Sequence, residues 1–165
     1  MKNIVLIGMP GCGKTTIGKL LSDQLNIKYC GIDEYIEKST GKTIPEIFKN
    51  GEERFRRIER EAVKEISKEE NTVIATGGGV IKYIENIDNL RKSGIIVYIN
   101  RPLENIIEDI DIDNRPLIKD KKEKLYTLYE ERYLLYKEYC DYEVMNTGSL
   151  QEVTQKIIGI IKNDN

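Results

Sequence analysis

The sequence contains no histidine and no tryptophan, and the first absence narrows the chemistry open to the chain. Histidine is the side chain that most often serves as a general base and as a metal ligand near neutral pH. A proton acceptor in this protein must therefore be a carboxylate, a lysine, a tyrosine or a water molecule.

Cysteine is scarce as well, and the three that occur, Cys12, Cys30 and Cys140, show no metal-ligand spacing. An odd number of scattered cysteines does not indicate a disulfide framework, so we interpret them as free thiols in a reducing compartment. This cysteine usage predicts a cytoplasmic protein.

The sequence also lacks a strong net charge of either sign and a long run of apolar residues. The 26 basic residues nearly balance the 28 acidic ones, which leaves a net charge of −2. That balance gives no electrostatic reason to expect nucleic acid or an anionic membrane as a partner. The first apolar run, Ile4 to Ile7, is too short for a signal-peptide core or a membrane span. We expect a monomer without nucleic-acid or membrane partners.

Short apolar runs alternate with longer amphipathic segments along the chain. The runs typical of strands are Ile4 to Ile7, Lys28 to Ile32, Thr72 to Ala75, Ile95 to Ile99 and Tyr142 to Met145. The segments with helical spacing are Lys14 to Leu25, Glu52 to Ser67, Ile81 to Lys92, Lys121 to Lys137 and Leu150 to Ile161. This alternation predicts an α/β fold, in which a doubly wound, five-stranded parallel sheet forms the middle of three layers. With 165 residues, we expect one domain over 1–165.

Two segments interrupt this alternation, and both follow predicted strands or a strand and its helix. We interpret 33–60 as an insert that binds a substrate and 108–120 as a lid. Ligands of open α/β sheets bind at the carboxyl ends of the strands, so both segments are placed to cover a site there.

The stretch Gly8 to Thr15 matches the phosphate-loop pattern G-x-x-x-x-G-K-[ST] between a predicted strand and a predicted helix. Its glycines allow backbone N–H groups to surround a phosphate, Lys14 is placed to reach the terminal phosphates, and the Thr15 hydroxyl can ligate Mg²⁺. We expect residues Gly11, Cys12, Gly13, Lys14, Thr15 and Thr16 to bind ATP. A GTP switch is disfavoured because no glycine has an aspartate three residues before it.

Cys12 lies inside this loop, next to the start of a predicted helix and close to Lys14. Both features lower the pKa of a thiol. We therefore expect a reactive thiolate that bound ATP protects from alkylation.

The segment after the second predicted strand holds two candidate acceptor residues. Asp33 is placed to accept a hydroxyl proton, although an aspartate there is equally suited to cap a helix. Arg56 and Glu59 are three residues apart on a predicted helix, where the carboxylate can orient the guanidinium. Taken alone, Arg56 is more readily interpreted as a charged residue on the solvent-exposed face of the helix.

Five stretches together resemble the shikimate kinases, a branch of the nucleoside monophosphate kinase group of phosphate-loop proteins. They are GMPGCGKTT at 8–16, IDEYIEKSTGKTIPEIFKNGEERFRRIE at 32–59, ATGGG at 75–79, NRPL at 114–117 and ERYLLY at 131–136. The second stretch is the most specific, and the resemblance covers nearly the whole chain.

The resemblance implies transfer of a phosphoryl group from ATP, with Mg²⁺, to the 3-hydroxyl of shikimate in aromatic amino-acid biosynthesis. It implies that Lys14, Asp33 and Arg115 are catalytic and that Arg115 also binds ATP. The residues implied to bind shikimate are Asp33, Arg56, Gly77, Gly78, Gly79 and Arg132. For the three glycines, a tight turn after a strand is an alternative to lining a pocket.

Two departures from the family pattern concern the binding of Mg²⁺ and the binding of the adenine ring. Gly31 stands where the family usually carries the first aspartate of Asp-x-Asp, so we expect weaker Mg²⁺ binding. The acidic stretch 108–113 occupies the region where relatives often carry a basic residue near adenine. Two alternatives remain: a kinase that phosphorylates a nucleoside monophosphate or gluconate, and a regulatory nucleotide-binding domain without turnover.

Overall fold

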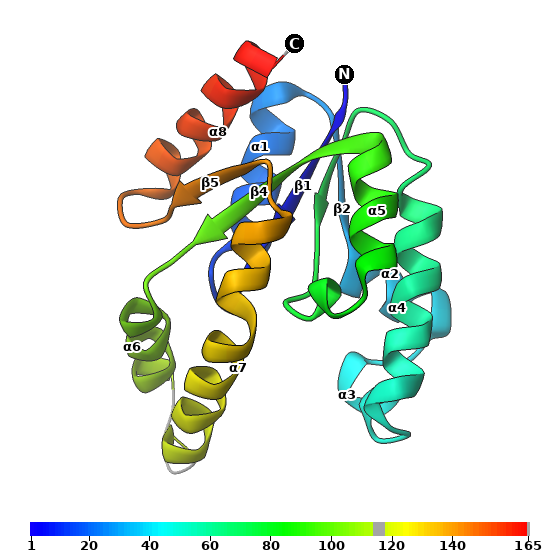
Figure 1. Cartoon of the computed structure of the whole chain (residues 1–165), viewed down its shortest axis with the longest axis vertical. Helices are drawn as coiled ribbons and strands as arrows, with labels where there is room; N and C mark the ends of the chain where they lie inside the picture. The colour runs from blue at the N-terminus through cyan, green and yellow to red at the C-terminus, as the bar shows by residue number, and fades with distance from the viewer. Residues whose placement is uncertain (114–117, 165) are drawn as a thin grey trace.

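A computed structural model describes the backbone of residues 1–113 and 118–164 and the side chains of 1–109 and 120–164. Five strands alternate with helices along the chain (Figure 1). The elements in order are β1 Asn3–Ile7, α1 Lys14–Leu25, β2 Lys28–Gly31, α2 Ile32–Thr40, α3 Ile44–Phe48, α4 Glu52–Ile66, β3 Thr72–Ala75, the 3₁₀ turn η1 Val80–Lys82, α5 Ile84–Ser93, β4 Gly94–Asn100, α6 Leu103–Asp113, α7 Ile118–Tyr139, β5 Tyr142–Met145 and α8 Leu150–Asp164.

The strands form one parallel sheet in the order β2-β3-β1-β4-β5. Strand β1 is central and fully buried, and Leu6 pairs with Ala75 of β3 on one side and with Val97 of β4 on the other. Helices α1 and α8 pack together on one face, whereas α5 and α7 pack against β4 on the other (Figure 1). The predicted three-layer parallel α/β fold is confirmed.

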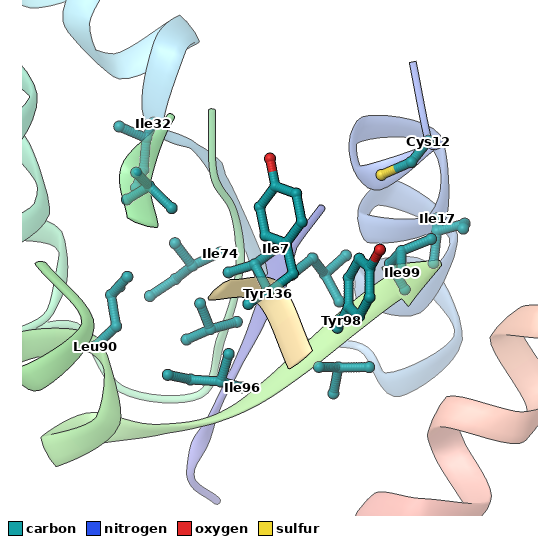
Figure 2. Close-up of a cluster of buried hydrophobic side chains, with 14 of the residues drawn as sticks. Ile7, Cys12, Ile17, Ile32, Ile74, Leu90, Ile96, Tyr98, Ile99 and Tyr136 are labelled. Carbon is teal, nitrogen blue, oxygen red and sulfur yellow. The ribbon is translucent and has the colours of Figure 1, made fainter. Parts of the chain in front are cut away.

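A stacked pair of tyrosines joins α7 to the sheet. The rings of Tyr98 on β4 and Tyr136 on α7 have their centroids 5.2 Å apart, and both residues are almost completely buried. Figure 2 shows the two rings among the isoleucines of the sheet, including Ile7 and Ile99. The Tyr136 hydroxyl donates to the carbonyl of Gly78 at 2.6 Å, so α7 is fixed both to the sheet and to the turn that follows β3.

The segment that contains α3 begins with a capping box that the sequence T-I-P-E encodes. The Thr43 hydroxyl accepts from the Glu46 N–H at 3.3 Å, and the Glu46 carboxylate accepts from the Thr43 N–H at 2.7 Å. These two bonds satisfy N–H groups that a helix start leaves without partners. The five residues of α3 therefore form a short helix between α2 and α4.

The helices differ from the sequence prediction in several places, and α2 and α3 form where the segment 33–60 was predicted only as an insert. Helix α6 was not predicted, although Leu103, Ile106 and Ile107 have helical spacing and are buried. The helix predicted from Ile81 starts instead at Ile84, because Val80–Lys82 form a 3₁₀ turn directly after the three glycines.

The parallel arrangement places the carboxyl ends of all five strands at one edge of the sheet. Strand β1 leads there into the phosphate loop, β2 into Asp33, and β3 into the three glycines. Strand β4 leads into Arg101, and β5 into Asn146. Within the described ranges, none of the helices is both long and apolar enough to cross a bilayer.

The opposite edge of the sheet depends on the buried side chain of Asn3. Its amide donates to the carbonyl of Glu69 at 2.7 Å and accepts from the N–H of Thr72 at 3.0 Å. We expect Asn3→Ala to lower the free energy of unfolding by about 1–3 kcal/mol, because the buried N–H of Thr72 and the partly buried carbonyl of Glu69 lose their partners. Urea unfolding measures the change. Lys2→Ala, which removes only an exposed ion pair with Asp164, is the control, and equal effects of the two substitutions would contradict this role.

Candidate active site

The phosphate loop connects β1 to α1 in a conformation that three glycines permit. Gly8, Gly11 and Gly13 have φ angles of 148°, 80° and 100°, which residues with a Cβ rarely adopt. The amide of Asn146, which follows β5, donates to the carbonyl of Cys12 at 2.9 Å and holds the loop from outside. Helix α1 then begins at Lys14, so the positive end of its dipole faces the edge where the strands end.

Lys14 lies folded against the loop to which it belongs. Its ammonium group donates to the carbonyl oxygens of Gly8 at 2.8 Å and Met9 at 2.9 Å. The residue is 8% exposed, yet it lines the cleft described below. Lys14 is therefore held at the wall of the cleft by carbonyl groups of its own loop.

The position of Cys12 does not support the expected reactive thiol. The residue is 1% exposed, and its sulfur lies under the loop, 3.6 Å from the Lys14 ammonium. Its N–H donates to the Met9 carbonyl at 3.1 Å, so in this conformation the group closes the turn of the loop. A reagent in solution cannot reach this sulfur unless the loop opens.

A cleft of about 750 Å³ lies over the carboxyl edge of the sheet. It brings together most of the residues that the sequence analysis assigns to ATP, along with part of the acceptor set. The predicted site residues that line it are Gly11, Gly13, Lys14, Thr15, Thr16, Asp33, Gly77 and Gly78. Arg56, Gly79 and Arg132 lie beside it and do not line it, and Arg115 falls outside the described residues.

Asp33 lies in the first turn of α2 and does not cap it, because the helix begins at Ile32 and its N-cap residue is Gly31. The alternative role as a helix cap is therefore excluded. The carboxylate faces the cleft, where it stays in contact with solvent although protein atoms surround it on other sides. This partial burial raises the pKa of Asp33, and the positive charges of Lys14 and Arg56 act in the opposite direction.

Each glycine of the triplet lies against a side chain or ring of the protein itself. A Cβ on Gly77 would lie 3.2 Å from Asp33 Oδ1 and 3.3 Å from Glu59 Oε2, and one on Gly78 would lie 2.8 Å from the ring of Pro10. A Cβ on Gly79 would overlap the guanidinium of Arg56. Gly77 and Gly79 therefore make room for charged groups of the site, and Gly78 makes room for Pro10 of the phosphate loop.

Arg56 and Glu59 form a buried ion pair on α4. Arg56 Nη1 donates to Glu59 Oε1 at 2.8 Å, and Glu59 is 0% exposed. Loss of solvent raises the pKa of Glu59, whereas the neighbouring charges of Arg56 and Arg132 lower it. The solvent-exposed role considered for Arg56 is excluded, since its side chain is only 8% exposed.

Arg132 on α7 is the second buried guanidinium of this region, with 7% exposure. Its Nε has no hydrogen-bond partner among the described residues, and Glu59 Oε2 likewise lacks one. Buried polar groups without partners are rare in folded proteins and indicate a place where a ligand or water completes the bonding. The acceptor half of the site therefore contains an unused buried donor.

At Gly31, a tyrosine and a glutamate fill the space that an aspartate side chain would need. A Cβ on Gly31 would lie 2.9 Å from the Tyr29 hydroxyl and 3.2 Å from the Glu34 carboxyl carbon. The Tyr29 hydroxyl has no hydrogen-bond partner among the described residues, and its burial raises the pKa of Tyr29 to about 12. An aspartate at position 31 would require Tyr29 or Glu34 to move.

Several cleft residues were not identified from the sequence. On the side toward α6 they are Arg101, Asn105 and Asp109, and on the side toward α8 they are Asn146, Thr147, Gly148 and Leu150. The signal that could have found them is their position, since Arg101 and Asn146 directly follow β4 and β5.

Gly79→Ala tests the close packing of Arg56 on the glycine triplet. We expect it to lower the free energy of unfolding by about 1–3 kcal/mol, because the new methyl group must displace a buried guanidinium. Chemical denaturation measures this change. The matched control is Gly159→Ala in α8, where a Cβ meets nothing within 4 Å and the helix should gain about 0.5–1 kcal/mol. Stabilisation by both substitutions would show that Arg56 does not need this space.

Comparisons with known proteins agree over the length of the chain. A family model described as shikimate kinase matches residues 10–162. A curated shikimate kinase from Clostridium botulinum (strain Alaska E43 / Type E3) is 52% identical, over 99% of this chain and 100% of that protein. The solved structure of a shikimate kinase from Acinetobacter baumannii in complex with shikimate has a TM-score of 0.91 and 36% identity, over 100% of this chain and 95% of that one. A crystal structure of the shikimate kinase from Aquifex aeolicus has a TM-score of 0.83, also with 36% identity, over 98% and 97% of the two chains. The phosphate loop, the acceptor side chains and these comparisons together establish that the chain belongs to the shikimate kinase family.

Proposed function

We propose that the protein is a shikimate kinase that transfers the γ-phosphoryl group of ATP to the 3-hydroxyl of shikimate. The observation that carries this proposal is the buried guanidinium pair beside the cleft, in which Arg132 holds an unused donor. Family membership and the structural similarity to a shikimate kinase in complex with shikimate support the same acceptor.

The charges around the acceptor half favour an anion. Arg56 and Arg132 bring two buried positive charges beside the cleft, and Arg56 is paired with Glu59 and with the more exposed Glu52. Arg132 keeps an Nε–H without a hydrogen-bond partner among the described residues, so it is the guanidinium left for the carboxylate of the acceptor. Guanidinium groups suit that task, because each offers a planar pair of donors and a permanent charge.

Asp33 is the residue that we assign to the acceptor hydroxyl. It lines the cleft on the side of Gly77, and its pKa lies above the ordinary value for an aspartate, which improves its capacity to take a proton. In a chain without histidine, it is the carboxylate in the cleft that lies nearest to the acceptor half. Asp33 would orient the hydroxyl and accept its proton during transfer.

The phosphate loop and Lys14 are assigned to the donor. Phosphoryl transfer depends on alignment and charge neutralisation more than on covalent catalysis. Lys14 would exchange the carbonyls of Gly8 and Met9 for phosphate oxygens. Arg115 remains the predicted residue that covers the phosphates from segment 108–120.

Mg²⁺ fits the donor set as an ion that ATP brings with it. Thr15 and Asp33 supply oxygen atoms to the same cleft, and oxygen ligands are the kind that Mg²⁺ prefers. Among the described residues there is no group of three or more acidic, cysteine or histidine side chains that could hold a metal ion alone. Thr15, with Asp33 through water, would therefore hold an ion whose other ligands are phosphate oxygens and water. When bound, Mg²⁺ neutralises charge on the phosphates.

Three further assignments complete the proposal. Segment 33–60 would contact the acceptor and segment 108–120 would close over ATP, which excludes water and limits idle hydrolysis. The protein would act as a cytoplasmic monomer. Gly31 would make its affinity for Mg²⁺ weaker than that of relatives with two aspartates.

The acceptor is tested by coupled measurement of ADP release from ATP and Mg²⁺ with shikimate, gluconate, AMP or CMP present. We expect turnover with shikimate alone, because the site combines a carboxylate-binding arginine pair with a hydroxyl-binding aspartate. Turnover on gluconate or a nucleoside monophosphate would assign the chain to a different acceptor. ATP binding without turnover on any acceptor would favour a regulatory domain.

The role of Asp33 is tested by Asp33→Asn and by the pH profile of kcat/KM. Asp33 accepts a proton only when ionised, so wild-type activity should fall as the pH decreases through the raised pKa of Asp33. We expect the Asp33→Asn substitution to lower kcat by about 10²–10⁴-fold, the range for loss of a general base. Asp23→Asn, an exposed change on α1, is the control. A loss of less than threefold in kcat for Asp33→Asn would exclude Asp33 as the proton acceptor.

A further inference from the structure

The ring of Tyr29 on β2 packs against α1, the helix that follows the phosphate loop. A Cβ on Gly18 of α1 would lie 3.0 Å from the edge of this ring, so the lack of a side chain there leaves room for it. The Lys19 ammonium lies 5.4 Å from the centroid of the same ring. Tyr29 is therefore fixed between the edge strand of the sheet and the first helix of the nucleotide site.

The hydroxyl of Tyr29 is buried and has no hydrogen-bond partner among the described residues. A Cβ on Gly31 would lie 2.9 Å from it, so the hydroxyl occupies space that a side chain at position 31 would need. Burial raises the pKa of Tyr29 to about 12, the charge of Glu34 adds to this rise, and the Thr15 hydroxyl opposes it. Thr15 and Glu34 therefore both lie near the Tyr29 hydroxyl, which stays protonated at neutral pH.

A buried hydroxyl without a partner calls for an explanation, because buried polar groups in folded proteins almost always have partners. Tyr136 follows that rule, since its hydroxyl donates to the carbonyl of Gly78 at 2.6 Å. A phenylalanine at position 29 would fill the space beside Gly18 without the cost of burying a hydroxyl. The hydroxyl of Tyr29 therefore indicates hydrogen bonds that form when the site is occupied.

The neighbours of this hydroxyl connect it to the metal ligand of the proposed function. Thr15 lines the cleft, and its hydroxyl is the group assigned to Mg²⁺. A hydroxyl that gives a lone pair to a cation must direct its proton elsewhere, and metal ligands are commonly oriented by such an outer partner. Glu34 is an acceptor held in place by Lys19, whose Nζ lies 3.3 Å from Glu34 Oε1. The Tyr29 hydroxyl is therefore placed to accept from Thr15 and to donate to Glu34.

We propose that Tyr29 is a positioning residue for the metal ion that accompanies the nucleotide. Its hydroxyl accepts a hydrogen bond from Thr15 and donates one to Glu34, which turns a lone pair of Thr15 toward the ion. The carboxylate of Glu34 thereby acts on the metal ligand through a neutral hydroxyl, in the space that Gly31 leaves open. Such a relay attracts a cation less than a carboxylate at position 31 would, in keeping with the weaker Mg²⁺ affinity proposed above.

This inference deepens the proposed function, because it rests on binding of a metal and a nucleotide at the phosphate loop. It does not depend on the identity of the acceptor. Absence of turnover on shikimate, with the metal-dependent binding described below intact, would contradict the proposed function and leave this inference standing.

The test is calorimetric titration with ADP in the presence of Mg²⁺ and again in the presence of EDTA, without an acceptor. We expect Tyr29→Phe to weaken binding of ADP with Mg²⁺ about three- to tenfold, the factor for one hydrogen bond. Binding of ADP in EDTA should change less than about twofold. Tyr142→Phe, which removes a hydroxyl bonded to Asp164, is the matched control and should leave both affinities unchanged. Unchanged binding with Mg²⁺, or equal weakening with and without the metal, would overturn the proposal.

Urea unfolding of the same variant separates positioning from a structural role. Tyr29→Phe should not lower the stability of the metal-free protein, because the hydroxyl has no bond there to lose. Lower stability together with unchanged metal-dependent binding would assign Tyr29 a structural role and overturn the proposal.

A double-mutant cycle with Gly31→Asp tests whether the hydroxyl stands in for a carboxylate. In the presence of Tyr29 the new side chain meets the hydroxyl, so we expect no gain in affinity for ADP with Mg²⁺. In the Tyr29→Phe background the space is free, and the double variant should bind ADP with Mg²⁺ at least as tightly as wild type, because Mg²⁺ prefers carboxylate oxygens. Equal effects of Gly31→Asp in the two backgrounds would show that the two groups do not share one position, which contradicts the proposal.

Discussion

In a parallel sheet that helices cover on both faces, the residues that follow each strand all emerge at the same edge, where the carboxyl ends of the strands lie. In this protein the order β2-β3-β1-β4-β5 sets the phosphate loop at the centre of that edge. The segments after β2 and β3 lie on one side of the loop and those after β4 and β5 on the other. The acceptor and donor halves of the cleft are consequences of this order: the acceptor half follows β2 and β3, and the donor half follows β1, β4 and β5.

The donor and acceptor halves hold their charges in different ways. Lys14 is satisfied by backbone carbonyls of the loop, whereas Arg56 is satisfied by a buried carboxylate three residues along the same helix. Burial of an ion pair costs solvation energy that its Coulomb attraction offsets only with good geometry. The glycines at 77–79 provide that geometry, because a side chain at any of them would crowd Asp33, Pro10 or Arg56.

The sequence predicted the strands and the phosphate loop well, because both depend on local patterns. The run at β1 and the spacing of glycines before Lys14 and Thr15 are short-range signals that tertiary structure did not alter. The burial of Cys12 and the 3₁₀ turn after Gly79 were not predicted, since they depend on packing against distant residues. Arg101 was missed because its partners lie in the loop and on α6, and the one sequence signal for it is its position directly after β4.

The bond from Asn146 to the Cys12 carbonyl spans 134 positions of the chain. During translation the loop emerges from the ribosome long before Asn146, so the growing chain carries a phosphate loop without this support until residue 146 has been added. Only when β5 has joined the edge of the sheet does Asn146 reach the loop. The nucleotide site is therefore completed only after β5 has been synthesised, and a shorter nascent chain lacks the contact that fixes it.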